Sequence, residues 1–293
     1  MKNTNTYRIA VASGKGGTGK TLVSVNLAAF ISEQQQCTLV DLDVEEPNDA
    51  LFISNELNVM KQVNKMIPVW DEDKCTLCGK CNEVCKFHAI MQLGTTILVF
   101  NELCHSCYAC SELCPEHALP MTEHPLGTIS DLHHNKLHFY ESRLNIGEEQ
   151  AVPLIKQTHK LLNTTHDESS IIIYDCPPGT SCPVVASTKE ADFVILVTEP
   201  TPFGLNDLKL AVETMGKLQK EVGVIINRDG IGDSQVEDFC NTENIPIIAR
   251  IPYDRKIAEI YSKGEIVYKK VPGLAKSLDG IYKLLTLKAL NHV

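Results

Sequence analysis

The chain has 293 residues and a formal net charge of −10 at pH 7. It is long enough to bury a full hydrophobic core, and its acidic balance argues against nucleic acid as a partner, because phosphate binding requires a basic face. The first six residues lead into a strand without an apolar signal segment, and no apolar run approaches the length of a membrane span. With 12 cysteines and no export signal, we expect a cytoplasmic protein.

A phosphate-binding loop follows the first predicted strand. Residues 7–13 are apolar enough for a buried strand, and residues 22–31 continue as a helix. The loop between them contains Gly14, Lys15, Gly16, Gly17, Thr18, Gly19, Lys20 and Thr21. In such a loop, backbone N–H groups and the helix N-terminus surround the β-phosphate, Lys20 reaches the β and γ oxygens, and the Thr21 hydroxyl binds Mg²⁺. The strand, loop and helix together predict a site for ATP and Mg²⁺.

Eight of the 12 cysteines fall in two copies of one ligand pattern. The first copy contains Cys75, Cys78, Cys81 and Cys85, and the second contains Cys104, Cys107, Cys110 and Cys114. The copies begin 29 residues apart, at positions 75 and 104, which indicates an internal duplication. This is the spacing of a bacterial two-cluster ferredoxin, in which the fourth cysteine of each run ligates the other cluster. We therefore predict one 4Fe–4S cluster on Cys75, Cys78, Cys81 and Cys114, and a second on Cys104, Cys107, Cys110 and Cys85.

Two other uses of these cysteines fit less well. A disulfide scaffold requires an oxidising compartment, which the absence of a signal segment disfavours. Zinc sites usually consist of separated cysteine pairs, whereas each run here has a third and a fourth cysteine close behind the first pair.

The remaining strands define the predicted fold. Buried strands are expected at residues 38–43, 171–175, 193–198 and 222–227. Strands alternating with helices predict an α/β fold with a doubly wound, mostly parallel sheet. The cysteine pattern interrupts it as an inserted α+β ferredoxin-like domain at residues 67–121, between ATPase-domain parts at residues 1–66 and 122–293.

Several residues outside these motifs have simpler explanations than a metal or membrane site. Cys176 and Cys182 are interpreted as small buried residues, with a metal or redox role at the dimer interface as the alternative. The histidines between residues 128 and 150, which are His133, His134 and His138, are interpreted as a solvated polar connection. The C-terminal apolar stripe of Leu274, Leu278, Ile281 and Leu285 predicts an amphipathic helix packed on the sheet more readily than a membrane-binding tail.

The early lysine makes the phosphate-binding loop more specific than an ordinary Walker A motif. The run from Lys15 through Lys20 and Thr21 resembles the deviant loop of the MinD/Mrp/nitrogenase iron protein superfamily of P-loop ATPases. The resemblance implies a dimer that encloses two ATP molecules, as a homodimer or a heterodimer with a paralogue. In that family the residue equivalent to Lys15 crosses the interface and stabilises charge on the transferring phosphoryl group. The alternative is a solvated loop lysine.

Other segments resemble the same superfamily in the same order. Asp43, at the end of the second predicted strand, would orient the attacking water, and Asp41 would lie near the metal. Asp175 would hold Mg²⁺ through water, and the amide of Gly179 would sense the γ-phosphate. The adenine base would be contacted by Asn227 on one side and by the segment containing Pro252 on the other. Strand-end carboxylates alone are common, so these roles depend on their order after the loop.

The combined motifs imply an ATPase with catalytic residues Lys15, Lys20 and Asp43. Closure of the dimer on ATP would gate electron transfer through the two clusters to a partner redox or metal-cofactor protein, in metallocluster assembly or reductive activation. The alternative is a nucleotide-dependent docking switch in which the clusters are structural or sense redox state.

Overall fold

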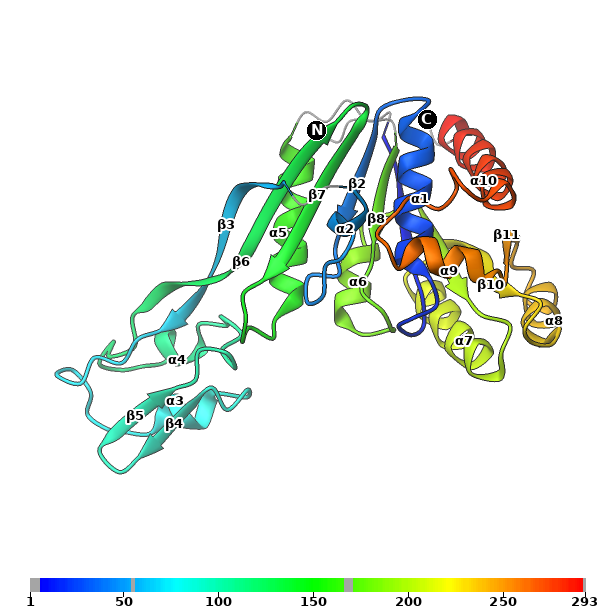
Figure 1. The fold of residues 1–293 in the computed structure, drawn as a ribbon. Coiled ribbons are helices and arrows are strands. Elements are labelled where there is room, and N and C mark those ends of the chain that lie inside the picture. The colour runs from blue at the N-terminus through cyan, green and yellow to red at the C-terminus, as the bar shows by residue number, and fades with distance from the viewer. Residues whose placement is uncertain (1–5, 54–55, 166–170, 292–293) are drawn as a thin grey trace.

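A nine-stranded sheet forms the centre of the protein, whose computed structural model describes residues 6–53, 56–165 and 171–291 (Figure 1). Its strands are β1 (Tyr7–Ala12), β2 (Cys37–Asp41), β3 (Asn58–Pro68), β6 (Met121–His134), β7 (Leu137–Leu144), β8 (Ile171–Asp175), β9 (Phe193–Thr198), β10 (Glu221–Asp229) and β11 (Ile247–Pro252). They lie in the order β11-β10-β9-β1-β8-β2-β7-β6-β3. Neighbours from β11 to β7 are parallel, and only the β7–β6 and β6–β3 pairs are antiparallel. The predicted α/β fold with a mostly parallel sheet is confirmed.

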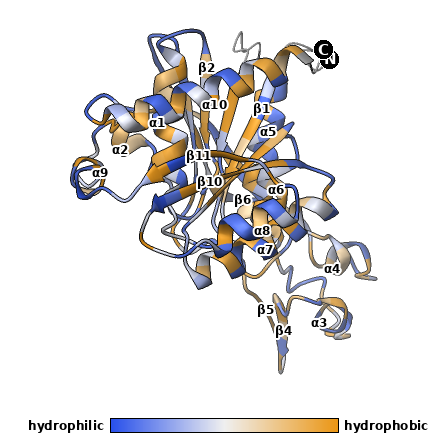
Figure 2. Cartoon of the chain, turned by 90° about the vertical axis from the view of Figure 1, so that its right-hand side faces the viewer, coloured by the Kyte–Doolittle hydropathy of each residue, from blue (hydrophilic) through white to orange (hydrophobic). Residues whose placement is uncertain are grey.

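Helices cover both faces of the sheet. One face is covered by α1 (Lys20–Ser32), α9 (Arg255–Tyr261) and α10 (Pro272–Asn291), with the short α2 (Ala50–Ile53) beside them. The other is covered by α5 (Ala151–Thr164), α6 (Cys182–Thr188), α7 (Pro202–Lys217) and α8 (Gln235–Thr242). Because both faces are covered, β1, β2, β8 and β9 are buried along their whole length. Figure 2 shows hydrophobic strands of the sheet, in orange, between the helices.

The C-terminal helix packs as its apolar stripe predicts. Leu274, Leu278, Ile281 and Leu285 on α10 are all buried in the core on the α1 side of the sheet. Among the described residues, no helix combines the length and the hydropathy needed to cross a membrane.

The cysteine-rich segment, residues 69–120, lies at the far end of a two-stranded arm. β3 and β6 pair antiparallel from Asn58 opposite Asp131 to Pro68 opposite Met121, and the segment connects their ends. It contains α3 (Lys80–Val84), the β4 (Ile90–Leu93) and β5 (Thr96–Val99) hairpin, and α4 (Ala109–Glu112). Figure 1 shows the segment projecting away from the helices that cover the sheet.

The three histidines were expected in a solvated polar connection; they lie instead on a hairpin, although His133 and His134 are exposed as expected. His133 and His134 end β6, His138 lies near the start of β7, and the two strands form an antiparallel hairpin. The turn between them contains Asn135 in the left-handed conformation, at φ 55°. Polar residues at the hairpin end obscured the alternation that buries Leu137 and Phe139.

A buried histidine on α5 predicts acid sensitivity of the fold. Burial lowers the pKa of His159 from 6.5 to about 4, and its Nε2 lies 3.2 Å from the Ala186 carbonyl oxygen. The unfolded chain takes up this proton first as the pH falls, so the stabilisation is present above pH 6.5 and is lost progressively toward pH 4. We expect the free energy of unfolding to fall by roughly 1 kcal/mol between about pH 7.5 and 5.5 through this residue. Urea unfolding of wild type and His159→Gln measures it: equal pH slopes in the two proteins would refute the assignment.

Candidate functional site

The phosphate-binding loop connects β1 to α1, and its conformation depends on Gly19. Gly19 has φ 97°, and a Cβ added there would lie 2.3 Å from Asn227 Nδ2. Asn227, on β10, donates from Nδ2 to the Thr18 carbonyl oxygen (2.8 Å). The last turn of the loop is therefore held against β10, at the edge of the sheet where parallel strands place their carboxyl ends.

A cavity of about 310 Å³ opens beside the loop. Its lining includes Gly17, Gly19, Asn227, Pro252 and Tyr261. The structure thus brings the loop together with both segments expected to contact a base, although those segments follow the loop by more than 200 positions in the chain. The size and position suit a nucleoside attached to phosphates in the loop.

Three carboxylates are buried next to the loop. Asp41 ends β2 and Asp175 ends β8, and the two are direct neighbours in the parallel register. Thr21 Oγ1 donates to Asp175 Oδ2 (2.8 Å). Asp41 Oδ2 accepts from the N–H groups of Asn48 and Asp49, at 2.9 and 3.1 Å, which brings the loop after β2 back toward the site.

Asp49 is the residue that sequence reasoning missed. It is completely buried, although it lies in a polar stretch that reads as a surface loop. Its position just before the short α2 was the only local signal, and that signal indicates a helix cap as readily as a metal ligand.

The electrostatics of these carboxylates fit a divalent cation. Burial raises the pKa values of Asp41, Asp49 and Asp175, and repulsion by Asp175 raises those of Asp41 and Asp49 further. Asp175 Oδ1 and both carboxylate oxygens of Asp49 are buried without a hydrogen-bond partner among the described residues. Buried carboxylates require a partner of opposite charge, and Mg²⁺ prefers oxygen ligands of this kind, with Thr21 beside them.

Two of the three predicted catalytic residues, Lys20 and Asp43, lie close to Asp175. Lys20 begins α1 and is buried, and its charge lowers the pKa values of Asp43 and Asp175. Burial outweighs this effect at Asp43 and raises the pKa of its carboxyl to about 6. Lys15, Gly16 and Gly17 lie at the open side of the loop, where Lys15 is half-buried and both glycines are exposed.

Gly179 follows β8 and contacts the loop from the other side. Its N–H donates to the Ser13 carbonyl oxygen (2.9 Å), and the Ser13 hydroxyl donates to the Lys15 carbonyl oxygen (2.5 Å). The amide expected to sense a γ-phosphate is therefore hydrogen-bonded to the end of β1 in this structure.

The eight motif cysteines are gathered into two groups in the cysteine-rich segment. One cavity is lined by Cys75, Cys78, Cys81 and Cys114. A second is lined by Cys85, Cys104, Cys107 and Cys110. Each group combines three cysteines of one run with the fourth cysteine of the other, and all 12 cysteines of the chain are free thiols.

The backbone repeats around these groups with the same 29-residue offset as the sequence. Left-handed conformations occur in three matched pairs, which are Leu77 and Ser106, Gly79 and Tyr108, and His88 and His117. Cys85 Sγ accepts from the Ala89 N–H and Cys114 Sγ accepts from the Ala118 N–H, both at 3.3 Å. Such turns point N–H groups toward sulfur and stabilise thiolates.

The raised pKa values of three motif thiols indicate that their thiolates need a positively charged centre beside them. Burial raises the pKa of Cys110 to about 11, and the neighbouring Cys104 and Cys107 raise it further. Burial also raises the pKa values of Cys81 and Cys104. Four thiolates in so small a space repel one another unless metal ions bind them, so the residues fit an iron–sulfur cluster.

The expectation that Cys176 and Cys182 are both buried was wrong for one of them. Cys176 is fully buried after β8, as expected. Cys182 is exposed at the start of α6, where it lines an open cavity of about 570 Å³ together with Phe87 and His105 of the cysteine-rich segment.

Comparison with known proteins gives three kinds of match. The model of the CbiA family, described as the CobQ/CobB/MinD/ParA nucleotide binding domain, matches residues 9–267. An uncharacterized protein of Methanocaldococcus jannaschii is 32% identical over 263 residues, covering 89% of this chain and 91% of the relative. An iron-sulfur cluster carrier protein of Pyrococcus horikoshii is 24% identical over 303 residues, covering 95% of this chain and 85% of the relative.

The fold also matches a solved structure along nearly its whole length. The septum site-determining protein MinD of Pyrococcus horikoshii, complexed with Mg-ADP, superposes with a TM-score of 0.59 at 20% identity. The match covers 97% of this chain and 98% of that one. At this identity the likeness shows a common fold.

Proposed function

The chain belongs to the CobQ/CobB/MinD/ParA nucleotide-binding family, and we propose that it is an ATP-hydrolysing iron–sulfur protein in which ATP binding gates electron transfer through two 4Fe–4S clusters. The observation that carries the proposal is the grouping of eight cysteines into two four-thiol cavities on a P-loop nucleotide-binding fold. The electrons would pass to a partner redox or metal-cofactor protein. The likeness to a protein named as an iron-sulfur cluster carrier supports a role in metallocluster assembly or reductive activation.

In this proposal residues 67–121 form an inserted ferredoxin-like domain, and residues 1–66 and 122–293 form the ATPase domain. Mg²⁺ near Thr21, Asp41 and Asp175 would neutralise the phosphate charge, and the clusters would supply one-electron chemistry. Lys20 would bind the β and γ oxygens, and Asp43 would orient the attacking water.

Lys15 would act on the nucleotide of a second subunit. Its place at the open side of the loop supports this role, because a residue at the loop surface can reach across a dimer interface. Its charge would stabilise the transferring phosphoryl group, as an arginine finger does. The dimer would be a homodimer or a heterodimer with a paralogue.

A chain of contacts connects the cysteine-rich segment to α5. Gln150 Nε2 donates to the carbonyl oxygens of Glu102 (3.2 Å) and Cys104 (2.6 Å). Lys65 donates to the Asn101 carbonyl oxygen (2.7 Å) and forms a buried ion pair with Glu148 (2.6 Å). Residues just before α5 are therefore bonded to the loop that carries the second group of cysteines.

The other end of this chain is Gly179. α5 packs against α6, and the His159–Ala186 contact joins the two helices. α6 begins at Cys182, three residues after Gly179. For the Gly179 amide to reach a γ-phosphate, its bond to Ser13 must break, and the resulting shift of α6 would be transmitted through α5 and Gln150 to Cys104. This is the route by which we infer that ATP and the clusters influence each other.

Thermodynamic linkage provides the test. If ATP binding changes the cluster potential, reduction must change the ATP affinity by the same free energy, and a typical coupling of about 1–3 kcal/mol equals a roughly 5–150-fold change. We expect anaerobic titrations of a non-hydrolysable ATP analogue to give different dissociation constants for oxidised and reduced protein. Gln150→Ala should remove most of this difference, whereas Gln157→Ala, whose carboxamide contacts Lys61 instead, should retain it. Equal affinities in the two redox states would rule out the gating.

An exposed apolar surface on the cysteine-rich segment supports the alternative function, a nucleotide-dependent docking switch. Met91 and Leu93 on β4 are 46% and 64% exposed, and Leu98 on β5 is 37% exposed. A patch of this kind suits a partner protein. In this alternative, the nucleotide state would control binding of the partner. An ATP affinity that is equal in oxidised and reduced protein would favour the docking switch over gated electron transfer.

A further inference from the structure

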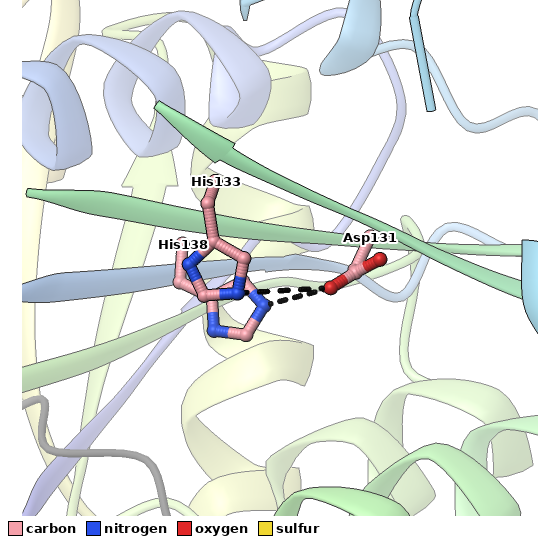
Figure 3. A group of neighbouring side chains, drawn as sticks. All are labelled: Asp131, His133 and His138. Carbon is pink, nitrogen blue, oxygen red and sulfur yellow. Dashed lines mark hydrogen bonds and ion pairs between the residues drawn. The ribbon is translucent and has the colours of Figure 1, made fainter. Parts of the chain in front are cut away.

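Three potential metal ligands meet on the β6–β7 hairpin, away from both sites described above. Asp131 and His133 lie on β6, and His138 lies on β7 directly opposite His133 in the register. Asp131 and His133 are two positions apart, so all three side chains project from the same face of the hairpin. Figure 3 shows both imidazole rings approaching one oxygen of Asp131.

The distances suit a tetrahedral transition metal. His138 Nε2 lies 3.2 Å from Asp131 Oδ2, and His133 Nε2 lies 3.8 Å from the same oxygen. Ligands bound at about 2.1 Å in a tetrahedron are roughly 3.4 Å apart, so the two separations lie on either side of the required value. The potential ligand atoms all lie within 4.8 Å of one another.

A hydrogen bond alone explains only part of this arrangement. A bond from His138 to Asp131 accounts for those two side chains, which are 13% and 15% exposed. It does not account for His133, which is 69% exposed and yet stacks on His138 with ring centroids 3.5 Å apart. Tyr140, further along the same face of β7, contacts the His138 ring from 4.2 Å between centroids and restricts its orientation.

We propose that Asp131, His133 and His138 form a third metal site, for Zn²⁺ or a similar borderline divalent ion. Two imidazoles and one carboxylate favour such an ion over Mg²⁺ or Ca²⁺, which prefer oxygen ligands. The exposed side of His133 leaves room for a water as fourth ligand.

The site is separate from the nucleotide. His138 pairs with Thr38 near the start of β2, whereas the buried carboxylate of Asp41 is at the other end of that strand. A metal there would join β6 and β7 at their turn. It would therefore stabilise the hairpin whose β6 strand continues to the cysteine-rich segment.

The test uses cluster-loaded protein under anaerobic conditions, so that the motif thiols are occupied. Zn²⁺ is titrated in competition with a chromophoric chelator, and iron content is measured before and after to exclude displacement. We expect one Zn²⁺ per chain, with binding weakened at least about tenfold in His133→Gln, in His138→Gln and in Asp131→Asn. His133→Gln is the most informative variant because the side chain is exposed and its loss should not perturb folding.

His134→Gln is the matched control. His134 is the next residue on β6 and is also exposed, but it projects from the opposite face of the strand. Its replacement should leave Zn²⁺ affinity unchanged. The proposal is overturned if wild type does not bind Zn²⁺, or binds it only while losing iron. It is also overturned if His134→Gln weakens Zn²⁺ binding as much as His133→Gln.

Discussion

Replacing Lys15 with alanine is expected to lower ATP turnover about 10³-fold or more while leaving nucleotide affinity largely intact. The expected size is that of removing one charge from the transferring phosphoryl group in related chemistry. Lys20→Ala is expected to behave differently, because Lys20 is buried at the start of α1 and would contact the phosphates of its own nucleotide. Its loss should weaken binding itself. Steady-state turnover and equilibrium binding of ATP separate the two outcomes.

Mixing the two variants tests whether Lys15 acts across a dimer. In a mixed dimer, the subunit with Lys15→Ala keeps its own Lys20 and would receive Lys15 from the other subunit, so one complete site is restored. If Lys15 acted within its own chain, neither subunit would have a complete site. Activity that rises on mixing supports the trans role, and wild-type turnover in Lys15→Ala alone would refute any catalytic role.

The second large effect concerns Cys78. Cys78→Ser is expected to reduce the iron content after anaerobic reconstitution from about eight to about four per chain, because one of the two clusters loses a ligand. Cys182→Ser is the matched control, since Cys182 is also exposed but lies outside the two groups. It should retain all of the iron. Zinc in place of iron, or four irons in the saturated wild type, would contradict the assignment.

Double variants test the crossed ligand sets. Cys78→Ser combined with Cys114→Ser removes two ligands from one group and should leave the second cluster intact. Cys78→Ser combined with Cys85→Ser removes one ligand from each group and should destroy both clusters. Uncrossed ligand sets predict the reverse, and EPR of the reduced proteins distinguishes the two patterns.

The features that sequence predicted well are those that depend on local pattern. The phosphate-binding loop, the strand ending at Asp175 and the strand predicted at residues 38–43, which the structure has at Cys37–Asp41, combine an apolar run with residues of special geometry or charge. Periodicity and glycine spacing identify such elements without any knowledge of the rest of the fold. The buried face of α10 was predictable for the same reason.

The features that sequence did not predict depend on contacts between distant segments. Asp49 is a buried carboxylate in a segment whose backbone N–H groups are bound by Asp41. The hairpin that contains His133 and His138 depends on pairing of two strands across a turn. Both strands are polar near that turn, so the sequence there lacks the alternation typical of a strand. Cys182 lines a cavity together with Phe87 and His105 of the cysteine-rich segment, a neighbourhood that no local pattern contains.

The most direct test of the account is a redox titration of the clusters with and without a non-hydrolysable ATP analogue, followed by EPR. A coupling of about 1–3 kcal/mol corresponds to a shift of roughly 40–130 mV, because about 59 mV equals a tenfold change for one electron. We predict a shift of this size in wild type and in Gln157→Ala, and a much smaller one in Gln150→Ala. Midpoint potentials that do not change when wild-type protein binds the analogue would contradict ATP-gated electron transfer.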